Sequence, residues 1–104
     1  MKKHFYVLVR ADLPTAQQLV QAVHAAYEAG KHLAGNSPDI DSTVICRIRD
    51  EQELLKAEAF LRYRGIRTVL FNEPDIGHEA TALATEPLAG QQRKVLSRYK
   101  LWEG

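Results

Sequence analysis

Two aspartates lie where open α/β proteins place their ligands. Asp12 follows the apolar run Phe5 to Val9 by a few residues, and Asp75 follows the run Val69 to Phe71 in the same way. Because parallel strands end at a common edge of a sheet, both carboxylates are expected at one rim. A carboxylate there can orient or deprotonate a water, while the Thr81 hydroxyl hydrogen-bonds the group under attack. A structural role also stays open, in which Asp75 closes a turn and Asp12 caps a helix.

Further polar side chains are expected beside this rim. Arg10 ends the first apolar run, and the helix-like stretch behind it carries Gln17, Gln21 and His24. A charged pair at a strand end that faces a polar helix start is typical of a binding-site floor. We therefore expect Arg10 and Asp12 to form that floor.

His24 offers a second kind of chemistry. His24, Glu28 and His32 fall near one face of a helix, as three metal ligands would. They lack the HExxH spacing and a second converging ligand set, so a His24 packed near the sheet or bonded to a loop carbonyl is favoured over a metal site.

Several function classes are disfavoured by the rest of the sequence. It contains no GxGxxG, Walker A or GxSxG pattern, which argues against the usual nucleotide cradles and a serine nucleophile elbow. The single cysteine, Cys46, lies in an apolar run and is expected to be a core thiol. A net charge of +1 argues against coating of nucleic acid by bulk electrostatics, though local basic clusters remain. No apolar run is long enough to span a bilayer or act as a signal peptide, so a cytoplasmic protein is expected.

The elements that position these residues follow from the hydrophobic pattern. Phe5 to Val9 is apolar without alternation, which predicts a central strand covered on both faces. Further strands are expected at 42–49, 66–71 and 81–85, with the last one antiparallel. The order β-α-β-α-β-β-α predicts an α/β three-layer sandwich, a four-stranded mixed sheet with helices on both faces. At 104 residues the chain is expected to form one domain, residues 1–104.

Capping patterns predict where the helices begin. Asp50 with Glu53, and Thr15 with Gln18, each fit a capping box. A last helix is expected at 91–99, after which the end of the chain docks back on the body, and 36–41 is expected to be a surface loop. The core-facing stripe of the first helix is expected to contain Leu19, Val20, Val23, Ala26 and Tyr27.

Four segments, in this order, resemble the type II peptidyl-tRNA hydrolase family of archaea and eukaryotes. The resemblance spans nearly the whole chain. The family's VVRxDL strand end, AQxxHA helix, DxG segment and TVLAIGP-like strand are matched here by Val9-Arg10-Ala11-Asp12-Leu13, Val20-Gln21-Ala22-Val23-His24-Ala25, Asp75-Ile76-Gly77 and Thr81-Ala82-Leu83-Ala84-Thr85-Glu86-Pro87.

The resemblance implies a reaction and a set of roles. The family hydrolyses the ester that joins a peptide to the 3′ end of tRNA, with a lysine, an aspartate and a threonine and no metal or other cofactor. The aspartate carries over to Asp75 and the threonine to Thr81, whereas the lysine position is occupied by Gln17. A glutamine keeps a hydrogen-bond donor but lacks the fixed charge that would stabilise an oxyanion or hold a phosphate.

The departure at Gln17 leaves two functions to compare. In the preferred one, the protein cleaves a tRNA-linked acyl ester, Gln17, Gln21 and His24 line or brace the site, and Arg10 with the C-terminal basic residues holds acceptor-stem phosphates. Either Arg10 or a lysine such as Lys31 would then supply the missing charge, or the chemistry is altered. In the alternative, the protein is a catalytically inactive member of the fold that binds a tRNA end, a nucleotide or a protein. The family resemblance also implies a homodimer.

Overall fold

The apolar run near the N-terminus forms the central strand of a mixed sheet in the computed structural model, which describes residues 2–33, 35 and 42–104. This strand, β1, is buried over its last five residues because both of its faces are covered. The elements are β1 (His4–Arg10), α1 (Thr15–His32), β2 (Ser42–Ile48), α2 (Glu51–Tyr63), β3 (Thr68–Glu73), the 3-10 helix η1 (Pro74–Ile76), β4 (Glu79–Thr85), the 3-10 helix η2 (Gly90–Arg98) and β5 (Lys100–Leu101).

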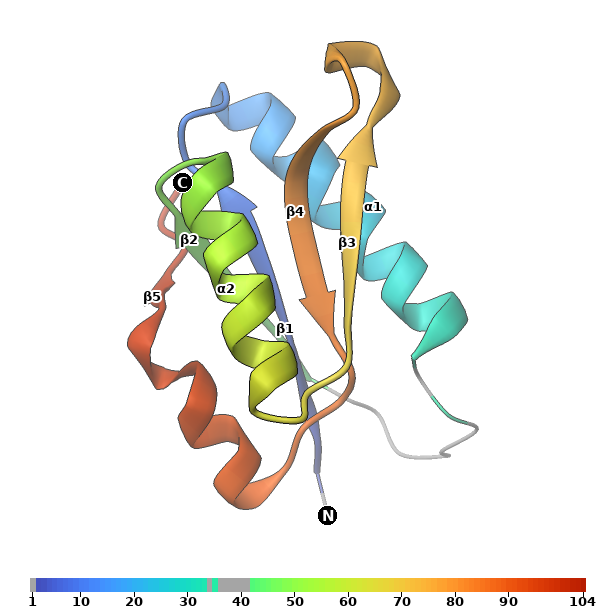
Figure 1. Cartoon of the computed structure of the whole chain (residues 1–104), viewed down its shortest axis with the longest axis vertical. Helices are drawn as coiled ribbons and strands as arrows, with labels where there is room; N and C mark the ends of the chain where they lie inside the picture. The colour runs from blue at the N-terminus through green and yellow to red at the C-terminus, as the bar shows by residue number, and fades with distance from the viewer. Residues whose placement is uncertain (1, 34, 36–41) are drawn as a thin grey trace.

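The sheet of the described residues has five strands in the order β3-β4-β1-β2-β5. β1 and β2 run parallel, β4 is antiparallel to both β1 and β3, and β5 is antiparallel to β2 (Figure 1). The α/β class and the antiparallel fourth strand are therefore confirmed. The prediction of four strands is wrong, because two residues near the C-terminus, Lys100 and Leu101, pair with Arg47 and Cys46 at the edge of the sheet.

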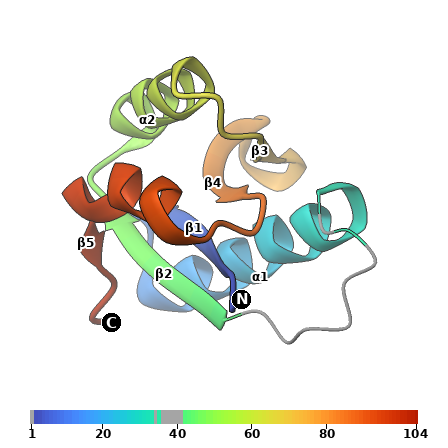
Figure 2. The ribbon, with the colours of Figure 1, turned by 90° about the horizontal axis from the view of Figure 1, so that it is seen from below.

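Helices cover the two faces of the sheet (Figure 2). On one face α1 packs over Val7, Val9, Ala82 and Ala84. On the other face α2 and η2 pack over a core that includes Leu8, Leu54, Leu61, Leu83 and Leu96. The helix predicted at 91–99 is the 3-10 helix η2 in the structure. Cys46 is a buried core thiol, as predicted, and burial raises its pKa.

Helix α1 meets the sheet with a different face from the one predicted. Leu19, Val20, Val23 and Tyr27 are 45–67% exposed, whereas Gln18, Gln21, Ala22, Ala25 and Ala29 are buried. The inner face of α1 packs its alanines on Val7, Val9, Ala82 and Ala84, so small side chains on both surfaces let the helix lie close to the sheet. The two inward glutamines are tolerated because their amides find hydrogen-bond partners.

The start of α1 also differs from the prediction, whereas the start of α2 agrees with it. Asp50 caps α2 by accepting a hydrogen bond from the Glu53 N–H at 2.9 Å. The N-cap of α1 is Pro14, with no side-chain cap, and Gln18 instead donates to the Leu13 carbonyl at 2.7 Å. The loop expected at 36–41 lies outside the described residues. Among the residues described, no helix combines the length and apolarity needed to cross a membrane.

Candidate functional site

A buried polar network lies between α1 and the β3–β4 edge of the sheet. The Thr81 hydroxyl donates to Gln21 Oε1 at 2.6 Å, and Gln21 Nε2 donates to Glu73 Oε2 at 2.8 Å. Thr81 is 0% exposed, Gln21 is 1% exposed and Glu73 is 9% exposed. The structure therefore joins two residues predicted for the site, Thr81 and Gln21, directly to each other, and Gln21 in turn binds a third residue, Glu73, that was not predicted.

Each member of the network is positioned by a different element. Gln21 lies on the inner face of α1 beside Ala22 and Ala25, whose small side chains let the helix approach the sheet closely. Thr81 lies in β4, and Glu73 is the last residue of β3. A buried glutamine must have its amide satisfied, so a hydroxyl donor on one side and a carboxylate acceptor on the other fix its orientation.

Glu73 is the carboxylate of this site. The Gln21 amide lowers the pKa of Glu73 most strongly, and the Asp75 backbone N–H lowers it further by donating to Glu73 Oε1 at 3.2 Å. Both donors favour the charged form, so Glu73 is ionised at neutral pH. The sequence pattern favoured Asp75 over Glu73, because the apolar run Val69 to Phe71 ends before Glu73, which the structure shows to be the last residue of β3.

Asp75 lies in a different environment from the one predicted. It sits in η1 with an exposed side chain, and among the described residues that side chain forms no hydrogen bond or ion pair. Asp75 contributes its backbone N–H to the network. This N–H donates to the Glu73 side chain, which caps the start of η1. Within the described residues, Asp75 and Thr81 are thus connected only through Glu73 and Gln21.

His24 stands at the solvent side of the network. Its Nε2 lies 4.0 Å from Glu73 Oε2, and its ring stacks on Phe71 of β3 with centroids 4.7 Å apart. The His24 side chain is 47% exposed, so one end of the ring is accessible to a ligand. The prediction that His24 packs near the sheet agrees with this position.

Gln17 is the remaining helix residue predicted for the site. It is exposed, and its Oε1 accepts a weak hydrogen bond from Gln21 Nε2 at 3.3 Å. Neither cation considered as a substitute for the family lysine reaches it. Lys31 lies near Glu28 and Tyr27, and Arg10 is bound elsewhere. Over the residues described, no lysine or arginine forms an ion pair or hydrogen bond with this network.

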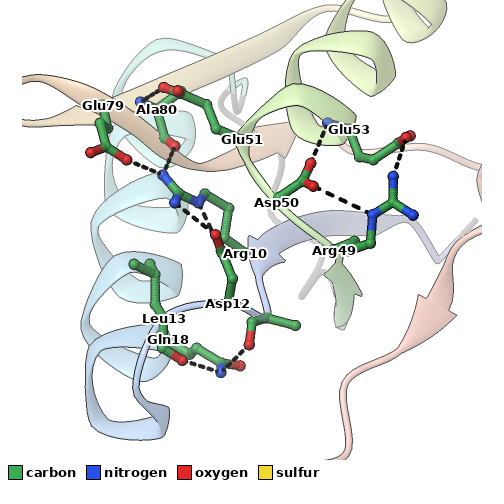
Figure 3. Close-up of polar contacts among 11 residues, drawn as sticks. Arg10, Asp12, Leu13, Gln18, Arg49, Asp50, Glu51, Glu53, Glu79 and Ala80 are labelled. Atoms are coloured by element: carbon green, nitrogen blue, oxygen red, sulfur yellow. Dashed lines mark hydrogen bonds and ion pairs between the residues drawn. The ribbon is translucent and has the colours of Figure 1, made fainter.

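Arg10 and Asp12 lie together in the structure, and they bind each other. The Arg10 guanidinium donates two hydrogen bonds to the Asp12 carboxylate, both at 2.9 Å, and others to Glu79 Oε1 and the Ala80 carbonyl (Figure 3). Asp12 raises the pKa of Arg10, and Arg10 in turn lowers the pKa of Asp12. The Arg10 side chain is 9% exposed, so its geometry fits a clamp between β1 and β4 better than a phosphate contact.

The network has the parts of an acid–base pair. An ionised carboxylate that is held by two donors lies close to an accessible imidazole, an arrangement that stabilises a protonated imidazole after proton transfer. The Thr81 hydroxyl, in contrast, is committed to Gln21. In the described part of the chain, no three His, Cys, Asp or Glu side chains gather as metal ligands would.

Comparison with known proteins adds information about the fold. No protein-family model and no curated protein matches the sequence. A solved structure of Atu0240, a protein of unknown function from Agrobacterium tumefaciens strain C58, is 18% identical, with 99% of each chain covered and a TM-score of 0.69. The two chains share a fold. At this identity the likeness concerns architecture, so function has to be argued from the side chains.

Proposed function

We propose that the protein hydrolyses an acyl ester at the 3′ end of tRNA, as type II peptidyl-tRNA hydrolases do, with His24 and Glu73 as its acid–base pair. The observation that carries the proposal is the ionised, buried Glu73 carboxylate within 4.0 Å of the accessible His24 ring. A carboxylate with a lowered pKa is a weak base, so the imidazole is the better proton acceptor of the two.

The proposed mechanism assigns one step to each group. His24 takes a proton from a water as that water attacks the ester carbonyl, and Glu73 stabilises the imidazolium that results. Gln17, whose Nε2 has no hydrogen-bond partner among the described residues, donates to the developing oxyanion. Gln21 and Thr81 hold Glu73 in place. The protonated His24 then returns its proton to the 3′ oxygen that leaves.

The decisive experiment uses a pair of isosteric variants. Purified protein is incubated with N-acetylaminoacyl-tRNA, and ester loss is followed for the wild type, Glu73→Gln and Asp75→Asn. Glu73→Gln is expected to lower kcat by about 100-fold or more, because the imidazolium loses its counter-charge. Asp75→Asn keeps the backbone N–H and is expected to change kcat by less than about 2-fold.

The two variants show whether Glu73 or Asp75 is the carboxylate that the reaction needs. A large loss in Asp75→Asn with activity kept in Glu73→Gln would overturn the Glu73 assignment and restore Asp75. Absence of ester loss above background in the wild type would remove the hydrolase proposal. Thermal unfolding followed by circular dichroism checks that both variants are folded.

A specific observation also favours the alternative, a catalytically inactive module that binds a tRNA end, a nucleotide or a protein. Thr81 and Gln21 satisfy each other, which leaves no buried free donor for an oxyanion among the site residues that the structure describes. Filter binding of tRNA that is steeply salt-dependent, in the absence of ester cleavage, would support this alternative.

Two further expectations remain predictions. The homodimer implied by the family resemblance is measured directly by light scattering during size-exclusion chromatography. The cytoplasmic location is tested by fractionation of the cells that express the protein.

A further inference from the structure

A basic groove runs along the carboxyl edge of β2, on the side of β1 away from β3 and β4. Its volume is about 440 Å³. The residues that line the basic groove are Ala11, Asp12, Arg47, Ile48, Arg49 and Lys100. Three of these six carry a positive charge and one carries a negative charge.

Arg47 and Lys100 lie directly opposite each other across the β2–β5 pair. Side chains at paired positions in antiparallel strands are about 5 Å apart at Cβ, so two like charges there destabilise the pairing. Within the described ranges, neither residue forms an ion pair or side-chain hydrogen bond, and both are exposed. An anion bound between the two side chains would relieve their repulsion.

The other charged residues that line the basic groove each have a charged partner. Asp12 accepts two hydrogen bonds from Arg10, so its negative charge is paired with that guanidinium. Arg49 is turned toward the start of α2, where it contacts Asp50 at 3.4 Å and Glu53 at 3.0 Å (Figure 3). The free positive charge therefore belongs to Arg47 and Lys100.

The basic groove and the Glu73 network share one rim. β2 lies three strands away from β3 in the sheet order, a distance of roughly 14 Å at the usual strand spacing. The first turn of α1 adds no acidic side chain at this rim, and the carboxylates of Asp12 and Glu79 are both bound to Arg10.

We propose that Arg47 and Lys100 form a phosphate-binding site for the backbone of the tRNA 3′ end, a few nucleotides from the ester at His24 and Glu73. The choice of tRNA as the source of the phosphate rests on the proposed function. A phosphodiester suits the basic groove because its oxygens can bridge two cations that stand side by side. The sequence already suggested the C-terminal basic residues as phosphate contacts, but it did not reveal that Lys100 lies opposite Arg47, because β5 was not predicted.

Binding of fluorescently labelled, deacylated tRNA tests this proposal. The wild type is compared by anisotropy with the double variant Arg47→Gln/Lys100→Gln and with the control Arg62→Gln/Arg64→Gln. The control removes the same charge at the far end of α2. The first double variant is expected to raise Kd by about 10-fold and to reduce the slope of log K against log salt by about 1, since it loses one phosphate contact. The control is expected to change both quantities little.

Three outcomes would overturn the proposal or part of it. Equal losses in the two double variants would mean that only net charge matters, which overturns the site. Wild-type protein that binds no tRNA, but shows inorganic phosphate-induced NMR shifts at Arg47 and Lys100, would overturn a polynucleotide as the ligand. Ester cleavage with an unchanged KM in Arg47→Gln/Lys100→Gln would overturn the site while keeping the hydrolase. If tRNA binding is lost only in Arg47→Gln/Lys100→Gln and no protein cleaves the ester, the phosphate site is supported and the hydrolase proposal is overturned.

Discussion

Thr81 and Gln21 are buried side chains whose polar atoms depend on each other. The Thr81 hydroxyl is the donor to Gln21 Oε1, and no solvent reaches either residue in quantity. A buried acceptor that loses its donor costs more free energy than the hydrogen bond contributed, because water cannot replace the partner. The stability of this part of the molecule therefore depends on one hydroxyl.

We predict that Thr81→Val lowers the free energy of unfolding by about 1–3 kcal/mol, since the substitution keeps the shape and leaves Gln21 Oε1 without a donor. Thr81→Ser retains the hydroxyl and serves as the control, with an expected loss below about 1 kcal/mol. Urea unfolding followed by circular dichroism measures both. A valine variant as stable as the serine variant would show that the hydrogen bond contributes little.

At the residue scale, the sequence identified part of the candidate site and missed its carboxylate. Gln21 and Thr81 were predicted and are joined in the structure. Glu73 was missed because the choice between two nearby carboxylates depends on non-local structure. The register of β3 and β4 shifts between Phe71 and Asn72, and this irregularity lies just before the point where Glu73 meets α1. Short-range patterns do not report such a shift.

At the scale of elements, the two helices show what local patterns can decide. Asp50 and Glu53 lie within one helical turn, so their capping interaction is local and the sequence predicted it. The inner face of α1 depends instead on partners far along the chain, such as Trp102, which donates to Gln18 Oε1 at 2.7 Å. Hydrophobic spacing alone favoured the outer stripe, because it could not foresee these partners for the glutamines.

We predict that Asp50→Ala lowers the free energy of unfolding by about 1 kcal/mol, because the Glu53 N–H loses its acceptor. Thr15→Ala at the start of α1 is the matched control, and its cost is expected to stay below about 0.5 kcal/mol since Thr15 caps nothing. Thermal and urea unfolding give the two values. A larger loss for Thr15→Ala than for Asp50→Ala would contradict both cap assignments.

At the scale of the whole molecule, two carboxylates with lowered pKa values lie at the same edge of the sheet. Arg10 lowers the pKa of Asp12 from its ordinary 3.8, and Gln21 lowers that of Glu73 from its ordinary 4.5. A lowered pKa in the folded state means that the unfolded chain binds protons first as the pH falls. These groups therefore stabilise the fold above about pH 4.5 and lose that effect as the pH drops through their lowered pKa values.

We predict that the urea midpoint of the wild type falls steadily between about pH 5 and pH 3. The double variant Asp12→Asn/Glu73→Gln lacks both titrating groups, so its midpoint is expected to fall less over the same range, from a lower starting value. Unfolding curves at half-unit steps of pH measure the difference. Parallel pH profiles for the two proteins would exclude these carboxylates as the source of acid sensitivity.

The fold class was predictable at this scale because the hydrophobic pattern indicates how strands and helices alternate along the chain. The fifth strand was not. β5 is only two residues long, Lys100 and Leu101, and its partner β2 lies more than fifty residues earlier in the chain. A segment so short carries no periodicity, and only the folded sheet edge selects it.

The position of β4 between β3 and β1 has a consequence for how the protein is made. β1 leaves the ribosome well before its partner β4, which ends at Thr85, and the backbone pair between His4 and Leu88 closes later still. The most apolar strand of the sheet thus keeps one edge unpaired until β4 has been synthesised. Until then the nascent chain exposes an edge that is prone to aggregate.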